Sequence, residues 1–417
     1  MSAHGEQDAR RTVEAVWRIE SARIVGALAR YTNDFALAED VAQEALAEAL
    51  QGWPKDGVPP NPAGWLYTVG RRRAVDAFRR RSGLDERYAV LAQGLEEQST
   101  DVLWDPDAID DDVLALLFIA CHPVLSAEAR VSLTLRVVGG LTSEEIARAF
   151  LVPVPTVQAR ITRAKKTLAA ARVPFEVPPA DERKARLANV LNVLYLIFTE
   201  GSTATSGRDL LRTDLADEAR RLVRVLAQLL PDEPEVFGLL ALMELTAARF
   251  PARVGPDGAV ILLEDQDRRR WDRAAVARGK GALSQAASIG RGLGAYGLQA
   301  AIASCHAAAP SVEGTDWGSI VVLYEALGRI APSPVVELNR AVAVSMADGP
   351  QNALAIVDDL AVDGRLAGSH LLPSVRGELL FRLGRTVEAG REFELAAGLC
   401  KNERERDLLL KKANRIS

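Results

Sequence analysis

Cysteine and histidine are scarce in this sequence, and neither shows the spacing of a metal-binding motif. The three cysteines, Cys121, Cys305 and Cys400, form no CxxC pair, and the four histidines, His4, His122, His306 and His370, are scattered. Metal-binding motifs place such ligands at short, regular spacings. We therefore expect no metal ion, no other cofactor and no disulfide framework, as in a reducing compartment.

Long apolar runs are also missing. No stretch approaches the about 18 apolar residues that a membrane-spanning helix needs. Residues 1–11 have no apolar core of the kind that a secretion signal requires. We expect a cytoplasmic protein with no membrane partner.

The motifs of common enzyme classes are absent as well. The sequence contains no Walker loop, no GxGxxG after a strand and no GxSxG. Cys121 and His122 are neighbours, but adjacent side chains on a helix point apart, so they do not pair as nucleophile and base. The glycine-rich stretch at 290–297 follows a helical segment and is a poor phosphate loop. These absences indicate that the chain is not an enzyme.

What the sequence has in quantity is alanine- and leucine-rich helical periodicity. Hydrophobic residues make up 48% of the chain, but no run shows the strict alternation of a β-sheet. We predict an all-α protein. Two small helical domains, the second with a helix-turn-helix, are joined by an acidic linker and followed by a large α-helical extension with tetratricopeptide-like repeats.

The segment 141–168, LTSEEIARAFLVPVPTVQARITRAKKTL, has the pattern of a helix-turn-helix. Thr142 and Glu145 have the spacing of a capping box, which starts a first helix. Two prolines then interrupt the pattern, and proline is tolerated in a first turn, so a second helix should begin near 154–156. The buried stripe of this second helix is expected at Val157, Ile161, Ala164 and Leu168.

The opposite face of the second helix carries polar and basic side chains. Such a helix fits a major groove, with its N-terminal residues nearest base edges and later cations nearest phosphates. The alternative is an ordinary helical hairpin with a solvated basic face. The candidate DNA contacts are Thr156, Gln158, Arg160, Arg163 and Lys166.

Three further helices are predicted upstream, around 24–31, 39–50 and 61–81. On the second of them, Asp40, Gln43 and Glu44 are spaced to share one exposed face, while apolar residues supply the packing side. Acidic and amide groups on a rigid helix suit a basic protein partner.

The third of these helices ends in a dense cluster of arginines. Like charges this close repel one another unless a polyanion is near. Trp65 and Tyr67 precede the cluster, and cations beside aromatics suit single-stranded nucleic acid. The alternatives are a solvated helix end, where cations favour the helix dipole, and a tryptophan in the core. The cluster consists of Arg71, Arg72, Arg73, Arg79, Arg80 and Arg81, with Asp76 among them.

In order and spacing these segments resemble one family. The run AEDVAQEAL, a WL-containing helix that ends in basic residues, an acidic linker and a helix-turn-helix ending TVQARITRAKKTL are similar to bacterial sigma factors of the extracytoplasmic-function type. The resemblance implies sigma region 2 at 10–81, a linker at 82–112 and sigma region 4 at 113–172.

The resemblance also implies a role for each surface. The helix with Asp40, Gln43 and Glu44 would dock on the clamp helices of the largest subunit of core RNA polymerase, and the flap of the second-largest subunit would be a further contact. The loop at 52–62 and the basic helix would engage the melted downstream promoter element, and the helix-turn-helix would bind the upstream element as duplex. The implied downstream contacts are Arg71, Arg72, Arg73, Asp76, Arg79 and Arg80.

The sequence departs from the usual pattern of that family at two positions. Arg72 stands where many members carry asparagine, and Pro153 stands where a serine or threonine cap is common. The first departure affects which downstream bases are preferred. The second affects how the recognition helix is capped.

Charge is distributed in blocks that the net charge of −5 conceals. Residues 1–81 carry a net charge of +1, residues 82–112 carry −9 and residues 113–172 carry +5. The acidic block predicts a flexible, solvated linker in isolation. In the resembled family the corresponding linker threads the polymerase cleft, where negative charge mimics nucleic acid.

Beyond residue 172 a proline-rich joint ends the preceding helix. We expect a helical extension at 173–290 and tetratricopeptide-like repeats at 291–417. Repeat-like positions recur at a spacing of about 33 to 36 residues. Such stacks usually present a concave face to a protein or ligand, or they hold domains together. The positions that carry the repeat pattern are Ala341, Ala353, Val357 and Leu360 in one unit and Gly377, Ala389, Phe393 and Ala396 in the next.

Two polar clusters, around Glu200 and at 264–273, resemble segments of the subgroup of these sigma factors that has a long C-terminal extension. They assign no chemistry by themselves. The sequence thus predicts a sigma factor that directs promoter recognition and transcription initiation. It also predicts a regulatory extension that either activates or inhibits the protein. The alternative is a helix-turn-helix regulator or scaffold whose repeat domain senses a ligand or protein.

Overall fold

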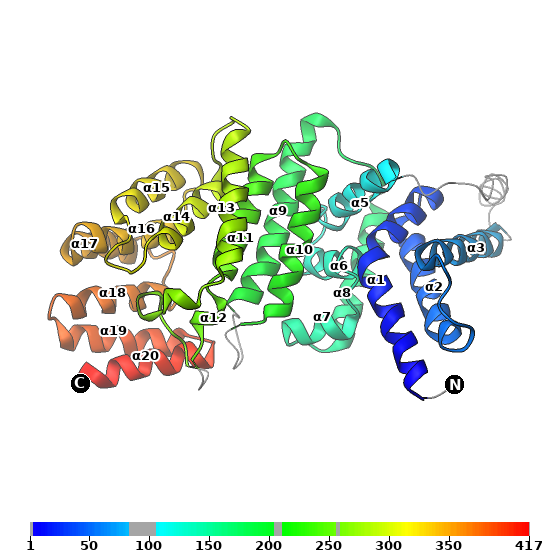
Figure 1. Ribbon diagram of the computed structural model, residues 1–417. Coiled ribbons are helices and arrows are strands. Elements are labelled where there is room, and N and C mark those ends of the chain that lie inside the picture. Colours follow the sequence, from blue (N-terminus) through cyan, green and yellow to red (C-terminus); the bar gives the residue numbers. More distant parts are fainter. Residues whose placement is uncertain (1–2, 83–105, 204–210, 256–258, 417) are drawn as a thin grey trace. The chain divides into compact units, whose positions relative to one another are not determined.

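The computed structural model describes residues 3–82, 106–203, 211–255 and 259–416 (Figure 1). The chain divides into two compact units, residues 1–196 and 197–417, and the division falls within helix α9 (Ala180–Ser202). Apart from one isolated β-bridge between Val254 and Val260, the regular structure of the described residues is helical. The all-α prediction is confirmed.

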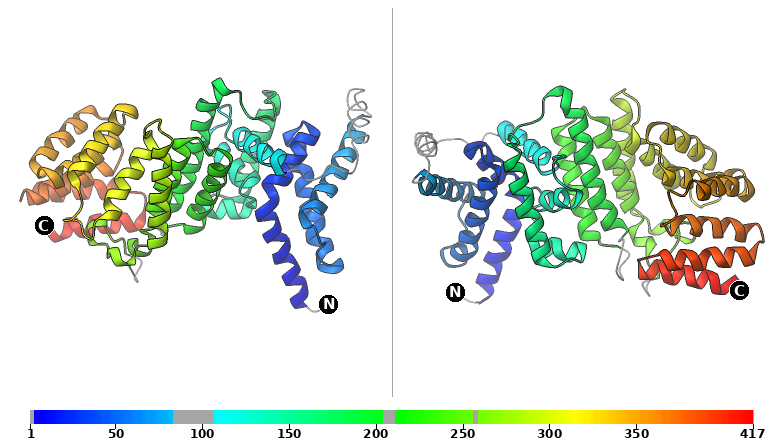
Figure 2. Two further views of the ribbon diagram at one scale, coloured as in Figure 1. Left: turned by 45° about the horizontal axis from the view of Figure 1, so that its top comes forward. Right: turned by 180° about the vertical axis from the view of Figure 1, so that it is seen from behind.

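The first unit is built around its N-terminal helix. This helix, α1, packs against α2, α3 and α5, and it lies beside α2 in both views of Figure 2. Its Ile24 and Leu28 are fully buried together with Leu66 of α3. Before α9 the unit contains α1 (Ala3–Thr32), α2 (Phe35–Asp56), α3 (Pro62–Ser82), α5 (Pro106–Ala120), α6 (Ala127–Val137), α7 (Ser143–Phe150) and α8 (Val154–Ala170).

The loop that leads into α3 is shorter than the sequence indicated. Helix α2 continues to Asp56, so the expected loop at 52–62 is reduced to residues 57–61. The last turn of α2 persists although it contains Pro54, because Trp53 is 3% exposed and its ring meets the Trp65 ring edge-on, with centroids 5.5 Å apart. Burial of the Trp53 indole and its contact with Trp65 outweigh one lost helical hydrogen bond.

The acidic stretch expected as a linker ends in a helix. Residues 106–112 form the first turns of α5, where proline is tolerated as the first residue. Asp112 is 5% exposed and lies against α1, because a Cβ added to Gly26 would come 2.9 Å from the Asp112 Cβ. The acidic residues of the stretch at 85, 86, 96, 97, 101 and 105 lie outside the described residues.

The second unit consists of helices that pack in sequence order from α14 onward. Two short 3-10 helices, η1 and η2, interrupt the helical order after α12. After the end of α9 the unit contains α10 (Thr213–Leu229), α11 (Pro234–Ala247), α12 (Phe250–Arg253), η1 (Leu263–Asp265), η2 (Arg268–Arg270), α13 (Arg273–Ser288), α14 (Ala295–Ala308), α15 (Trp317–Ile330), α16 (Pro334–Ala347), α17 (Pro350–Asp363), α18 (Leu371–Arg382), α19 (Thr386–Leu399) and α20 (Glu403–Ile416).

The positions that suggested repeats are core positions. A Cβ added to Gly377 would come 3.0 Å from the ring of Phe393, so the small residue lets α18 approach α19. The helix pairs α16–α17 and α18–α19 pack internally, and their assignment to tetratricopeptide repeats stays a prediction. One core cluster contains Ala341, Ala353, Val357, Leu360, Ala389, Phe393 and Ala396.

None of the described helices combines the length and the hydropathy that crossing a bilayer demands.

Helices α11 and α14 approach most closely at glycines, which gives a stability prediction. A Cβ at Gly238 would come 2.6 Å from the backbone nitrogen of Gly297. Gly238→Ala should therefore lower the free energy of unfolding by about 1–3 kcal/mol, as overpacked sites do. Gly281→Ala is the matched control, because Gly281 lies in α13 with nothing within 4 Å of the added carbon. The control should raise the same free energy by about 0.4–1 kcal/mol. Urea unfolding followed by circular dichroism checks both, and an unaffected Gly238→Ala would contradict this packing.

The buried Asp112 predicts that the free energy of unfolding depends on pH. Burial raises the pKa of its carboxyl to about 6, although Arg30 at 3.4 Å opposes the shift. Between about pH 4 and pH 6 the folded chain holds a proton that the unfolded chain releases, so the free energy of unfolding falls as pH rises through this window. Asp112→Asn should remove this fall and stabilise the protein at pH 7.

The matched control for that experiment is Asp111→Asn, because Asp111 is exposed and adjacent. Urea midpoints of the wild type and both variants, measured at pH 4.5 and pH 7, give the comparison. The same pH response in Asp112→Asn and in the wild type would show that Asp112 is not the titrating group.

Candidate nucleic-acid interface

The first helix of the helix-turn-helix begins as the sequence predicted. Thr142 is the N-cap of α7, its hydroxyl accepts from the Glu145 backbone N–H at 3.1 Å, and the Glu145 carboxylate accepts from the Thr142 N–H at 2.8 Å. This reciprocal pair is a complete capping box. The helix ends at Leu151, which has a left-handed φ of 51°. Helix α7 therefore has a defined start and a defined end.

The second helix, α8, presents its expected faces. It begins at Val154 behind Pro153, which offers no side-chain cap, so only the Pro153 carbonyl binds the first turn, through the Thr156 N–H at 2.9 Å. Gln158, Arg163 and Lys166 are exposed, and Thr156 and Arg160 are half-buried. The predicted stripe is buried at all four positions, Val157, Ile161, Ala164 and Leu168.

The arginine cluster on α3 is partly neutralised within the chain. Glu48 of α2 accepts from Arg72 at 2.9 Å and from Arg73 at 2.8 Å. These bonds, the one from Arg73 above all, lower the pKa of the Glu48 carboxyl. Arg71 stacks over the Tyr31 ring, 4.9 Å from its centroid. Arg79, Arg80 and Asp76 are exposed farther along the helix.

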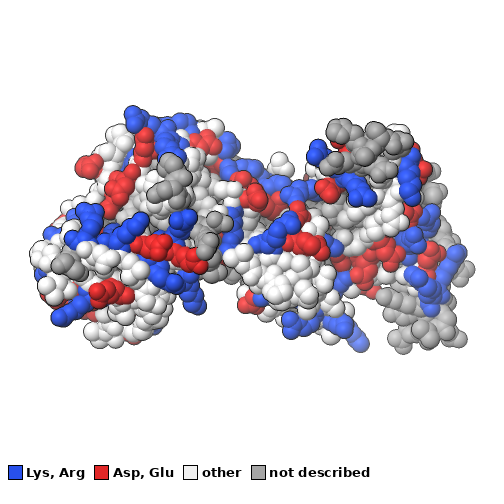
Figure 3. Space-filling view, turned by 90° about the horizontal axis from the view of Figure 1, so that it is seen from below, with Lys and Arg blue, Asp and Glu red and all other residues white. Residues whose placement is uncertain are grey.

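The acidic face expected on α2 is present. Asp40 and Glu44 are exposed and Gln43 is half-buried. Glu44 lies 3.9 Å from Arg73, so this face and the arginine cluster adjoin. Basic and acidic side chains are interleaved in short patches over the molecular face seen in Figure 3.

An ion-pair cluster that sequence reasoning missed joins α2 to α8. Glu39 is 3% exposed, accepts from Lys165 at 2.7 Å and lies 3.4 Å from Arg136 of α6. Lys165 also donates to Asp40. Burial alone would lower the pKa of the Lys165 ammonium, but the two carboxylates raise it. We call Glu39, Asp40, Arg136 and Lys165 the α2–α8 ion cluster.

The sequence held only a weak signal for this cluster. Glu39 is the one acidic residue on the α2 stripe that otherwise buries apolar side chains such as Val41 and Ala42. A buried carboxylate needs a cationic partner, but the sequence places Lys165 126 residues away. Lys166, which was predicted as a DNA contact on this helix, is exposed beside Lys165.

Two further contacts join α1 to the helix-turn-helix and to the segment before it. Arg18 of α1 donates to the capping-box carboxylate of Glu145 at 2.6 Å. Gly140 has a φ of 68°, and a Cβ there would come 2.6 Å from the Ser21 hydroxyl. The segment before the helix-turn-helix therefore packs closely on α1.

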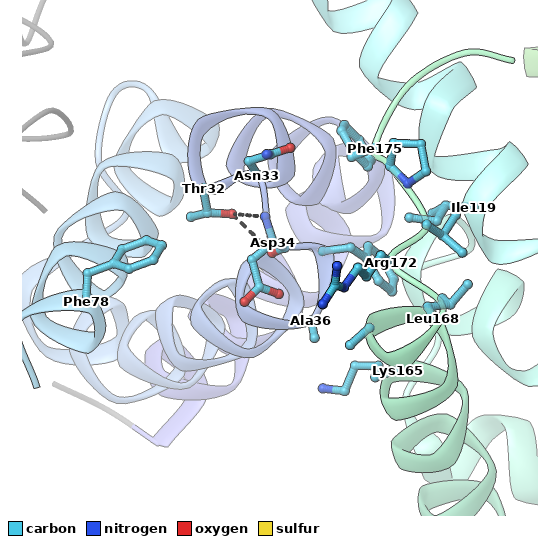
Figure 4. Close-up of a pocket in the computed structure, with 14 residues that line it drawn as sticks. Thr32, Asn33, Asp34, Ala36, Phe78, Ile119, Lys165, Leu168, Arg172 and Phe175 are labelled. Carbon is cyan, nitrogen blue, oxygen red and sulfur yellow. Dashed lines mark hydrogen bonds between the residues drawn. The ribbon is translucent and has the colours of Figure 1, made fainter. Parts of the chain in front are cut away.

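A groove of about 500 Å³ lies next to the ion cluster. Figure 4 shows Thr32, Asn33 and Asp34 of the α1–α2 turn on one side and the end of α8 with Arg172 on the other. The Thr32 hydroxyl donates a hydrogen bond to the Leu28 carbonyl of α1 at 2.8 Å. The groove combines one lysine and one arginine with apolar walls and shows no nucleophile–base pair among its described lining.

The neighbouring cysteine and histidine at 121 and 122 are structural. Cys121 is buried beside Thr134, and burial raises the pKa of its thiol to about 12, so it does not supply a thiolate. His122 accepts from the Val124 N–H through Nδ1 at 3.1 Å.

The two polar clusters of the extension also have structural partners. Arg268 is 8% exposed and donates to the carbonyls of His306 and Ala309 at 2.8 Å, where it satisfies the C-terminal end of α14. Trp271 belongs to the buried core beside it. Glu200 pairs with Arg212 across the end of α9.

Family comparisons agree with this geometry. The chain matches Sigma-70 region 2 over residues 18–83, Sigma-70 region 4 over residues 115–168 and a family of unknown function, DUF6596, over residues 186–287. An uncharacterized protein of Rhizobium meliloti is 45% identical over 393 residues, which cover 91% of this chain and 90% of that protein.

Two named relatives match a smaller share of the chain. The probable ECF RNA polymerase sigma factor SigI of Mycobacterium tuberculosis is 29% identical over 174 residues, 41% of this chain and 59% of that protein. The ECF RNA polymerase sigma factor SigL of the same species is 32% identical over 140 residues, 33% of this chain and 76% of that protein.

The α2–α8 ion cluster predicts how firmly the two helices are held together. Lys165→Ala leaves Glu39 buried with only the more distant Arg136, so closure of α2 on α8 should weaken by about 1–3 kcal/mol. Amide hydrogen exchange should then become faster in α2 and α8. Lys166→Ala removes an exposed neighbour of the same charge and should leave exchange unchanged. Equal exchange in the wild type and Lys165→Ala would show that the ion cluster does not hold the helices together.

Proposed function

Because the chain belongs to the extracytoplasmic-function sigma factors of the sigma-70 family, we propose that three surfaces of its first unit divide the work of promoter recognition. The observation that carries this proposal is the capped helix-turn-helix in the same compact unit as the acidic face of α2 and the arginine cluster of α3. A regulator needs the first of these surfaces only. A sigma factor needs all three.

The acidic face of α2 is the proposed docking site for core RNA polymerase. Asp40 and Glu44 are exposed one helical turn apart, with Gln43 beside them. Carboxylates on a rigid helix complement a basic partner and accelerate its encounter. We assign the clamp helices of the largest subunit to this face, and the flap of the second-largest subunit to region 4.

The basic end of α3 is the proposed site for the opened downstream element. Arg79 and Arg80 are exposed, and Arg72 and Arg73 both bond to the carboxylate of Glu48, while Arg73 also lies 3.9 Å from Glu44. Phosphates can replace that carboxylate, since surface ion pairs of this kind contribute only about 0–1 kcal/mol. Arg71 and Asp76 complete the proposed surface. Trp65 packs edge-on against Trp53, so it supports the loop before α3.

Helix α8 is the proposed reader of the upstream duplex. Thr156 and Gln158 lie in its first turns, where a recognition helix contacts base edges, and Arg160, Arg163 and Lys166 follow toward its C-terminal half. Arginine can bind a guanine edge with two hydrogen bonds, whereas lysine neutralises a phosphate as a point charge.

The α2–α8 ion cluster connects the first and third of these surfaces. Lys165 donates to Asp40, so a basic partner at the docking face competes with Lys165 for the same carboxylate. We propose that docking on polymerase releases Lys165 and lets region 4 move away from α2. The released lysine would then join the basic rim of α8.

The second unit is the proposed regulatory part. Helix α9 contributes to both units, and its first part is anchored in the first unit by Arg186, which donates to the Phe118 carbonyl, and by Asn189, which accepts from Arg130. A protein or ligand on the helical repeats would thereby act on a helix that region 4 also contacts.

The test of the sigma function is transcription in vitro from a promoter library with the full-length chain and core RNA polymerase. We expect specific transcripts that neither component gives alone. A helix-turn-helix regulator or scaffold would bind DNA but would start no transcription with core polymerase. That result would contradict the proposal.

Arg163 gives a quantitative prediction on the selected promoter. Arg163→Ala should weaken binding to the upstream duplex roughly 5- to 150-fold, which corresponds to one good base contact. Arg329→Ala is the control, because it removes an exposed arginine from α15 in the second unit. Titration at two salt concentrations separates a base contact from a phosphate contact. If Arg163→Ala weakens binding and also makes the affinity less dependent on salt concentration, Arg163 contacts a phosphate.

A further inference from the structure

A histidine, a cysteine and a glutamate that lie far apart in the sequence meet in the last three helices. His370 precedes α18, Cys400 ends α19 and Glu405 lies in the first turn of α20. The His370 Nε2, Cys400 Sγ and one Glu405 oxygen all lie within 4.8 Å of one another. These three positions hold one of the three cysteines and one of the four histidines in the chain.

The spacing of these atoms is compatible with a metal ion between them. Glu405 Oε2 is 3.6 Å from His370 Nε2, which is too long for a hydrogen bond between nitrogen and oxygen. The Cys400 thiol donates to the same Glu405 oxygen at 3.8 Å and to the Asn402 carbonyl at 3.5 Å. Around a tetrahedral zinc ion, bonds of about 2.0–2.3 Å place neighbouring ligand atoms roughly 3.3–3.6 Å apart. A small inward movement of each side chain would complete such a site.

The donor set indicates which ion would bind. A thiolate, an imidazole and a carboxylate suit zinc, whereas magnesium and calcium prefer oxygen ligands alone. Cys400 is only 1% exposed and borders the core cluster, while the His370 and Glu405 side chains are 29% and 27% exposed. The thiol is therefore the most deeply buried of the three ligands. The other two are partly exposed, so an ion can enter from solvent.

The surroundings hold the ligands in place. Asn402 caps α20, because its side-chain oxygen accepts from the N–H groups of Arg404 and Glu405. Arg406 donates to the Cys400 carbonyl at 2.7 Å, which fixes the turn between α19 and α20. Two of the three ligands therefore sit on one rigid turn, and only His370 comes from another part of the unit.

We propose that His370, Cys400 and Glu405 bind one zinc ion, with water in the fourth position. Binding displaces the thiol proton of Cys400 to solvent, since the thiolate is the ligand. The ion would tie the start of α18 to the turn between α19 and α20. The C-terminal end of the extension would thereby become more stable when zinc is available. This inference does not depend on the sigma function of the first unit.

The experiment uses the full-length protein after removal of metal with a chelator. Titration with Co²⁺ should give one equivalent of a thiolate-to-cobalt charge-transfer absorption, and Zn²⁺ should abolish that absorption. Cys400→Ser and His370→Ala should each lose the band. Cys305→Ser is the matched control, because Cys305 is half-buried in α14 outside the cluster, and this variant should keep the band.

A second measurement guards against a variant that does not fold. Zn²⁺ should raise the unfolding temperature of the wild type and of Cys305→Ser, and it should leave that of His370→Ala unchanged at equal helical content. His370 is partly exposed, so its loss removes a ligand without opening the core. No cobalt band in the wild type, or a band that survives Cys400→Ser, would overturn the proposal. Either result would leave a hydrogen-bonded cluster of structural residues.

Discussion

A buried carboxylate, Glu39, is the constraint on which the arrangement of the first unit depends. A charge taken out of water is costly unless cations satisfy it, and here Lys165 of α8 and Arg136 of α6 do so. The requirement binds region 2 to region 4 through side chains 97 and 126 residues away from Glu39 in sequence. Helix propensity or apolar burial alone would not fix which helix faces which.

The same ion cluster relates structure to function. Asp40 takes part in it and also belongs to the proposed polymerase face. A side chain with two mutually exclusive partners behaves as a two-state element, and a ligand shifts such an element only by its difference in affinity for the two states. The Arg18–Glu145 pair adds a second bond that would have to break in the proposed movement. It is exposed, so it contributes less than the buried cluster.

The second unit is held together by close helix contacts and by buried polar contacts. Its helices approach at small residues, as Gly238 does at Gly297 and Gly377 does at Phe393. Arg220 there pairs with the buried carboxylate of Glu244 at 2.7 Å, whereas Arg268 binds the free carbonyls at the end of α14. The sequence showed the small residues through their periodicity. It could not show the arginine as a helix cap, because the capped helix lies about forty residues downstream.

Local information was sufficient for the helix-turn-helix and its buried stripe. The capping box at Thr142, the start of α8 and its buried stripe follow from residues within a few positions of one another, where helical geometry fixes the outcome. The end of α2 was placed too early, because a contact between Trp53 and Trp65 overrides Pro54. The pairing of Glu39 with Lys165, the burial of Asp112 against α1 and the meeting of His370 with Cys400 were decided only by the tertiary structure. Each of these joins side chains from distant segments, and their pairing depends on where the packed helices place them.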